Sequence, residues 1–242
     1  MKHIVSVKGR LENGKIVTDI TPEETVSLVE DKKIVIIKEI FSEEEMLALR
    51  KSVVAWGKVI APVNQDDFKA NYHCLKAKIS NIQKVPHVFH DYNFNDFGAL
   101  PMELKIKLNQ VFECLRIFYN RLTGYDAKLG VKENAAYFHP QLIQYPSGGG
   151  FFGRHSHNLL PQKIGFILSM ARYGKDYRGG GTCFVTNDEV VDLEGHHDIG
   201  DLCLFRFDID HWVKQSPLDD KFNWDDENGR WVATLAYFDP FN

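Results

Sequence analysis

The chain has 242 residues, of which 44% are hydrophobic and 26% are charged, as in an ordinary soluble globular protein. Its formal net charge of -4 gives no reason to expect nucleic acid or an anionic membrane as a partner. The sequence has no apolar run of membrane-spanning length, and its N-terminus lacks the apolar core of a signal peptide, so we expect a cytoplasmic protein.

The four cysteines lie far apart in the sequence, and none forms a C-x-x-C pair. This spacing indicates reduced thiols rather than a disulfide framework, and it excludes a zinc finger. We therefore do not expect cysteine to carry the chemistry.

The first part of the chain is predicted to be a scaffold of β-structure and two helices. Thr21-Pro22-Glu23-Glu24 combines an N-cap, a proline at the first helical position and a capping-box glutamate. The continuous apolar run at 34–37 is typical of a buried strand. A second capping box at Ser42-Glu43-Glu44-Glu45 opens a helix to about Trp56. No catalytic group is evident in this part.

Residues 57–100 have no clear periodicity but contain His73, His87 and His90 among aromatic neighbours. Two interpretations remain open for this segment: a surface-covering loop with locally bonded histidines, or a lid over a substrate pocket. From Pro101, apolar residues three and four apart predict a long helix with a broad buried stripe. Gly124 stands where the C-terminal cap of that helix belongs.

After Gly124 the sequence changes to short apolar or alternating runs separated by glycine, proline and acidic turns. We expect strands at 141–145, 164–170, 182–185, 201–207 and 231–238. Many short strands of this kind favour a sandwich or jelly roll. With no repeat and no clear linker, one domain of residues 1–242 is the simplest count, with 1–125 as the helical and β-containing scaffold and 126–242 as the core.

The candidate metal site begins at His155-Ser156-His157, just after a glycine-rich turn at 146–150. In an extended strand, residues two apart point to the same face, so these two imidazoles are expected to project together. Two imidazoles aimed at one point can hold a transition metal.

Two later residues could complete such a site. His211 follows the strand predicted at 201–207, and Arg230 opens the last strand. A metal held on one side by three side chains keeps positions open for a cosubstrate and dioxygen. An arginine in the same cavity would clamp a carboxylate through two hydrogen bonds.

With these pieces in this order, the region from Gln141 to Phe238 resembles the iron(II)- and 2-oxoglutarate-dependent dioxygenases. That family carries His-x-Asp or His-x-Glu, then a distal histidine, then an arginine or lysine on a following strand. The resemblance implies a double-stranded β-helix, a jelly roll of the cupin kind, with helices outside the barrel. It also implies metal ligands at His155, His157 and His211, and 2-oxoglutarate bound by Arg230 and Tyr145.

The sequence departs from this family pattern in two places. His157 stands where the family has its carboxylate, which changes the usual ligand set of two histidines and one carboxylate. Val232 stands where the family often has a serine two residues after the arginine. Thr234 is on the same strand face as Arg230 and could supply that hydroxyl instead.

Other titratable groups near the site are not expected to be ligands. His196 and His197 are adjacent between glycine and acidic residues, which predicts a solvated turn. Asp210 should face away from His211 if the strand is regular, because neighbouring strand residues point to opposite faces.

The resemblance implies an oxidoreductase that uses Fe(II), 2-oxoglutarate and dioxygen to hydroxylate a small organic molecule. Neither nucleic acid nor a membrane is expected as a partner, and the oligomeric state is left open. Two alternatives remain: a three-histidine iron dioxygenase that does not use 2-oxoglutarate, and a jelly roll that binds a metal or ligand without catalysis.

Overall fold

The computed structural model describes residues 2–64, 70–79, 85–132 and 134–240. The first two helices begin where the sequence predicts. Helices α1 (Pro22–Glu30) and α2 (Glu43–Val59) each have a complete capping box, in which the hydroxyl of Thr21 or Ser42 accepts from a backbone N–H three residues later. The sequence thus fixes both helix starts through local hydrogen bonds.

The third helix, α3 (Met102–Thr123), is the long amphipathic helix expected after Pro101. It ends at Gly124, whose φ of 74° places it in the left-handed conformation of a helix C-cap. Between the two long helices lies a short 3₁₀ turn, η1 (Phe97–Ala99).

Fourteen strands form the rest of the described structure. They are β1 (Ile4–Glu12), β2 (Lys15–Thr18), β3 (Ile34–Lys38), β4 (Tyr72–Lys78), β5 (His87–Asn93), β6 (Lys128–Leu129), β7 (Tyr137–Pro146), β8 (Phe151–His155), β9 (Ile164–Ser169), β10 (Thr182–Thr186), β11 (Glu189–Asp192), β12 (Leu202–Arg206), β13 (His211–Val213) and β14 (Gly229–Phe238).

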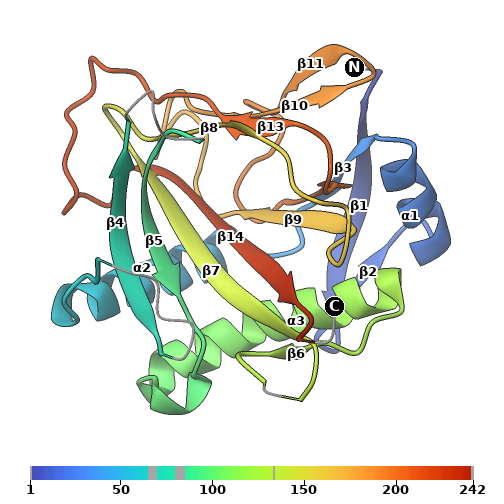
Figure 1. Ribbon diagram of the computed structural model, residues 1–242, viewed down its shortest axis with the longest axis horizontal. Coiled ribbons are helices and arrows are strands. Elements are labelled where there is room, and N and C mark those ends of the chain that lie inside the picture. Colours follow the sequence, from blue (N-terminus) through green and yellow to red (C-terminus); the bar gives the residue numbers. More distant parts are fainter. Residues whose placement is uncertain (1, 65–69, 80–84, 133, 241–242) are drawn as a thin grey trace.

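The strand order shows two layers. A long layer runs β2-β1-β3-β12-β9-β14-β7-β5 with β4 beyond it, and a short layer runs β8-β13-β10-β11. Successive strands from β7 to β14 pass between the layers, except for the hairpin of β10 and β11, and this alternation defines a double-stranded β-helix. Figure 1 shows the short layer across the top of the long strands. The predicted jelly-roll fold is confirmed.

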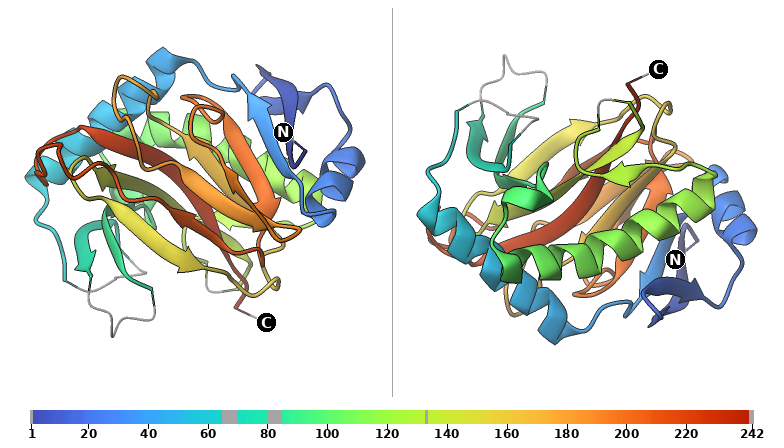
Figure 2. Two further views of the ribbon diagram at one scale, coloured as in Figure 1. Left: turned by 90° about the horizontal axis from the view of Figure 1, so that it is seen from above. Right: turned by 90° about the horizontal axis from the view of Figure 1, so that it is seen from below.

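The outer face of the long layer is covered by helices. Helix α3 runs along this face with α2 beside it (Figure 2, right). The main apolar core lies between these helices and the long layer. There Phe112 and Phe118 of α3 pack in one cluster with Leu142 of β7 and Trp231 of β14. Because side chains alternate along a strand, the neighbouring residues Tyr145 and Val232 face the other way, between the layers.

Residues 57–100 are more regular than the sequence predicts. They contain the end of α2 and the antiparallel strands β4 and β5, which extend the long layer through pairing of β5 with β7. The expectation of a surface loop is therefore wrong for the described part, and 65–69 and 80–84 lie outside it. The sequence of β5 does not alternate between polar and apolar residues because both faces of the strand are covered. Polar residues such as His90, Asp91 and Asn93 are buried there.

In the described part of the chain, no helix is long and apolar enough to cross a membrane.

Candidate metal centre

His155 and His211 lie opposite each other on paired strands of the short layer. His155 ends β8, His211 begins β13, and the two are cross-strand partners with ring centroids 4.3 Å apart. Each ring uses Nδ1 to donate to a backbone carbonyl two residues earlier, Gly153 at 2.8 Å and Ile209 at 2.9 Å. A carbonyl can only accept, so in each ring Nε2 is left with the free lone pair that a metal requires.

His157 lies two residues beyond His155, just after β8 has ended, so the two do not share one regular strand as predicted. The ligand atoms of His155, His157 and His211 nevertheless all lie within 4.8 Å of one another. The ring of His157 stacks on Phe207 with centroids 4.2 Å apart and an interplanar angle of 7°. This stacking contact restricts the orientation of the His157 ring, which is the most exposed of the three.

The surroundings keep these imidazoles in their neutral, ligating form. Burial, and then the neighbouring imidazole of His155, lower the pKa of His157 to about 4 and that of His211 to about 3. Burial also lowers the pKa of His155. At neutral pH the cluster therefore offers three uncharged nitrogen donors.

This donor set fits a transition metal. Three neutral imidazoles suit Fe(II), Zn(II) or Cu(II), and ligands from one side leave other positions open. Among the described histidines, cysteines and acids, only these three come together as a potential metal-binding group. Asp210 does not join them, because its carboxylate accepts from Nε and a terminal nitrogen of Arg154 at 2.8 and 2.6 Å on the outside of the short layer. Asp210 therefore faces away as expected.

A cavity of about 190 Å³ between the two layers connects the three histidines with the candidate cosubstrate residues. Its walls are mainly aromatic and aliphatic, including Phe152, Phe205 and Val232. Arg230, Tyr145 and Thr234 line the same cavity. The structure thus brings all six residues singled out in the sequence to one space.

Arg230 is the cation of this cavity. Its side chain is buried, donates to the hydroxyl of Thr182 and lies 5.7 Å from the ring centroid of Tyr145. Within the described ranges, no carboxylate forms an ion pair with it, although an isolated buried charge is costly. An arginine in this situation is suited to pair with an anionic ligand.

Two residues next to Arg230 were not singled out from the sequence as partners. The Thr182 hydroxyl accepts a hydrogen bond from Arg230. The Tyr177 hydroxyl also lies near Arg230: burial raises its pKa, and the charge of Arg230 only partly offsets this rise. Spacing along the sequence does not predict the contact of Thr182 with Arg230, because that contact crosses from the short to the long layer. Thr234, in contrast, donates its hydroxyl proton to the carbonyl of Phe166 at 2.7 Å, which leaves it only its lone pairs for another ligand.

The other histidines described below do not belong to the three-histidine cluster. His196 is exposed in a turn, as predicted. The expected exposure of His197 is wrong: it is buried, and its Nε2 donates to the carbonyl of Asp201 at 2.9 Å. His73 and His90 lie on the opposite face of the long layer. All four cysteines are buried, and none of them forms a disulfide.

Comparison with known proteins places the fold but gives no close relative. No protein-family model matches the chain, and no curated protein matches it in sequence. A prolyl hydroxylase from Trichoplax adhaerens, solved with a hypoxia inducible factor peptide fragment, is 16% identical with a TM-score of 0.56, covering 90% of both chains. A 2OG-Fe(II) oxygenase family oxidoreductase from Burkholderia pseudomallei is 10% identical with a TM-score of 0.56, covering 94% of this chain and 93% of that one.

A third solved structure, the non-heme alpha ketoglutarate dependent epimerase SnoN from nogalamycin biosynthesis, is 8% identical with a TM-score of 0.58 and covers 90% of this chain and 82% of that one. At these identities the likeness concerns the fold.

The chain has the jelly-roll fold of 2OG-Fe(II) oxygenases, with a three-histidine cluster between its layers.

Proposed function

We propose that this protein is an Fe(II)- and 2-oxoglutarate-dependent oxygenase that hydroxylates a small organic molecule at a three-histidine metal centre. The observation that carries the proposal is a buried arginine, with no acidic partner among the described residues, in the same cavity as three neutral imidazoles. The fold shared with oxygenases of this chemistry supports it.

In this proposal, His155, His157 and His211 hold Fe(II). When bound, iron and 2-oxoglutarate supply the oxidation chemistry, in which dioxygen is consumed and 2-oxoglutarate loses carbon dioxide to give succinate. The backbone carbonyls of Gly153 and Ile209 orient two of the rings and keep their Nε2 atoms unprotonated. The third imidazole leaves the site one charge more positive than a carboxylate would.

Arg230 binds the distal carboxylate of 2-oxoglutarate. Its guanidinium supplies the charge and the paired donors that a carboxylate requires, and the Thr182 hydroxyl holds it in place. Tyr145 lies beside the guanidinium and adds its hydroxyl, and Thr234 offers an acceptor further along β14. The dianionic cosubstrate would then neutralise two of the three positive charges that Fe(II) and Arg230 supply.

The cavity also limits the substrate. About 190 Å³ is less than the several hundred cubic ångströms of a typical ligand pocket, so the part of the substrate that enters must be small. The small volume of this cavity supports a small organic molecule as substrate.

The test is anaerobic addition of Fe(II) and 2-oxoglutarate to the full-length chain, followed by visible absorption for the charge-transfer band of the chelate. We expect a band with the wild-type chain and a much higher 2-oxoglutarate requirement with Arg230→Ala. No band, or an unchanged requirement in Arg230→Ala, would contradict the cosubstrate assignment.

Two results distinguish the alternatives. Substrate oxidation without release of succinate would indicate a three-histidine dioxygenase that does not use 2-oxoglutarate. Stoichiometric iron binding with no 2-oxoglutarate turnover across a broad substrate panel would indicate a binding protein.

A further inference from the structure

The cavity that the three histidines line runs along the inner face of β7 and β14 to a second polar end. Its lining includes three cross-strand pairs of these strands: Arg230 with Tyr145, Val232 with Ile143, and Thr234 with Gln141. Gln141 lies four residues from Tyr145, which corresponds to about 13 Å along an extended strand. The cavity therefore has the proposed carboxylate clamp at one end and an amide side chain at the other.

The amide of Gln141 is held in one orientation by its neighbours. Its Nε2 donates to Oδ1 of Asn93 at 2.8 Å, and the same oxygen accepts from Nε2 of His139 at 2.6 Å. Within the described residues Gln141 has no further side-chain hydrogen bond, so its Oε1 is left to accept from a ligand. Asn93 is fully buried, and its Nδ2 has no hydrogen-bond partner among the described residues. An unsatisfied buried group costs stability, and such departures are typical of functional sites.

The other amide and hydroxyl groups at this end of the cavity are already engaged. Gln162 is buried, and both the nitrogen and the oxygen of its amide bond to backbone groups. Thr234 donates its hydroxyl proton to a backbone carbonyl of β9. The neighbouring walls are apolar and include Ile143 and Ile167. Gln141 is thus the amide of this cavity that has an acceptor to offer.

The charge of the lining limits what Gln141 can bind. Arg230 is the charged side chain of the cavity, and among the described residues no aspartate, glutamate or lysine lines it. Asp91, on the adjacent strand β5, is paired with Lys76 at 3.0 Å and does not line the cavity. A cation beside Gln141 would lose water without gaining a carboxylate, and an anion would meet an amide oxygen that is itself an acceptor. An uncharged hydrogen-bond donor avoids both costs.

We propose that Gln141 is a specificity-determining residue that hydrogen-bonds the substrate, and that the substrate is an uncharged molecule with a hydroxyl or amide N–H donor on a compact apolar body. The donor would bond to Oε1 of Gln141. The apolar body would pack against Ile143 and Ile167, in the space that the histidines also line. This inference rests on the proposed oxygenase function, whose substrate it narrows to neutral alcohols and amides.

Three probes of nearly equal shape separate the donor from the charge. Benzyl alcohol carries an uncharged donor, toluene carries none, and benzylamine carries a protonated one at neutral pH. By anaerobic isothermal titration calorimetry with Fe(II) and 2-oxoglutarate present, we expect the alcohol to bind about fivefold more tightly than toluene. It should bind about tenfold more tightly than benzylamine. Equal binding of alcohol and toluene, tighter binding of benzylamine, or no binding of the alcohol would overturn the inference.

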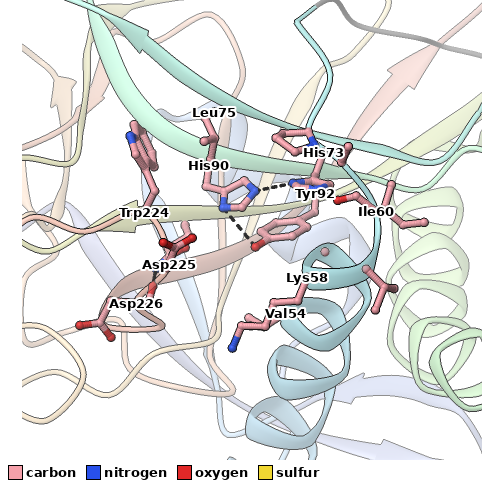
Figure 3. Close-up of a pocket in the computed structure, with 15 residues that line it drawn as sticks. Val54, Lys58, Ile60, His73, Leu75, His90, Tyr92, Trp224, Asp225 and Asp226 are labelled. Atoms are coloured by element: carbon pink, nitrogen blue, oxygen red, sulfur yellow. Dashed lines mark hydrogen bonds between the residues drawn. The ribbon is translucent and has the colours of Figure 1, made fainter.

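A larger cavity, of about 470 Å³, lies on the opposite face of the long layer, and Gln144 lines it instead of the metal cavity. Its buried rings bond to one another: His73 with His90 at 2.8 Å, and His90 with the hydroxyl of Tyr92 at 3.1 Å (Figure 3). This outer cavity is large enough for an aromatic probe. Binding there has to be distinguished from binding at Gln141.

Three variants locate the bound alcohol. Gln141→Leu removes the acceptor and should lower the affinity for the alcohol to that for toluene, whereas the affinity for toluene should not fall, which excludes a general loss of structure. Gln110→Leu, on the exposed side of α3, is the matched control and should change neither affinity. Tyr92→Phe removes a hydroxyl from the outer cavity and should leave the preference for the alcohol unchanged. A full preference in Gln141→Leu, or a lost preference in Tyr92→Phe, would place the probe elsewhere and refute the inference.

The absorption band of the iron chelate, recorded on the same wild-type samples, reports on the proposed oxygenase function separately. A band together with equal binding of alcohol and toluene would overturn the substrate assignment alone. No band, together with a preference for the alcohol that Gln141→Leu abolishes, would contradict the cosubstrate assignment and support the binding role of Gln141.

Discussion

His155 and His211 face each other across the β8–β13 ladder, and each ring is anchored through Nδ1 to the carbonyl two residues before it. This symmetry aims two Nε2 lone pairs at one point before any metal is bound. Such preorganisation lowers the cost of assembling a metal centre.

The first prediction concerns these two ligands and His157. His155→Ala or His211→Ala should lower Fe(II) affinity by at least about 100-fold, because each removes an anchored donor. His157→Ala should weaken binding less, by about tenfold or more, because His157 is the most exposed of the three. Competition with a chelator measures all three, and His196→Ala is the matched control. Loss of binding in that control would refute the ligand set.

His157→Asp tests whether the third imidazole occupies the position of a carboxylate. The variant would carry two histidines and one carboxylate, a common ligand set for non-haem Fe(II). We expect it to retain Fe(II) binding that His157→Ala loses, as measured by the same competition. If Asp and Ala at this position weaken binding equally, residue 157 does not reach the metal.

Asp210→Asn addresses the acid nearest in sequence to a ligand. Since the Asp210 carboxylate is engaged by Arg154 and half-exposed, the change should cost no more than about 1 kcal/mol of unfolding free energy. Fe(II) affinity should stay within about twofold of wild type. A large loss of affinity would mean that Asp210 turns toward the metal.

Arg230→Met tests the unpaired buried charge. Replacing the guanidinium removes a desolvated cation, so the unfolding free energy should be unchanged within about 1 kcal/mol or should rise. Arg50→Met is the contrast, because Arg50 is buried with Asp176 at 3.1 Å and its loss should cost about 2 kcal/mol or more. Urea unfolding measures both.

The same pair of variants reports on the cosubstrate. With Fe(II) present, 2-oxoglutarate should raise the melting temperature of wild type and of Arg50→Met but not of Arg230→Met, because a ligand stabilises the state that binds it. A similar rise in Arg230→Met would place the carboxylate elsewhere.

His197 predicts a pH dependence of stability. Burial, and then the charge of Arg230, hold its pKa at about 3 in the folded protein, against an ordinary value of 6.5. Between pH 3 and pH 6.5 the unfolded chain binds more protons at this histidine than the folded protein does. The contribution of neutral His197 to the free energy of unfolding is therefore complete above pH 6.5 and is lost as the pH falls toward 3. The slope for this one group approaches about 1.4 kcal/mol per pH unit.

Urea unfolding of His197→Gln at several pH values should show a smaller loss of stability on acidification than wild type. His196→Gln, at the exposed neighbouring position, should keep the wild-type slope. Equal slopes for the two variants would show that His197 is not the buried group responsible.

Local patterns in the sequence predicted most of the scaffold. The capping boxes at Thr21 and Ser42, the apolar stripe of α3 and its cap at Gly124 depend on contacts within one or two turns, which a sequence displays directly. Strands β7, β9, β10, β12 and β14 were predicted for a related reason, since turn residues separate apolar runs. Strands β4 and β5 were missed, and in β5 neighbours bury both faces and remove the alternation of polar and apolar residues. The short strands β6 and β11 were also missed.

The order of three histidines and an arginine along the chain was enough to name the residues that could form a metal centre. The pairing of His155 with His211, the outward direction of Asp210 and the contact of Arg230 with Thr182 became evident only from the folded chain. So did the lack of an acidic partner for Arg230 among the described residues. The physical reason is that spacing along a strand gives the direction of a side chain but not its partner. Partners depend on how the two layers pair and on which polar groups that packing removes from water.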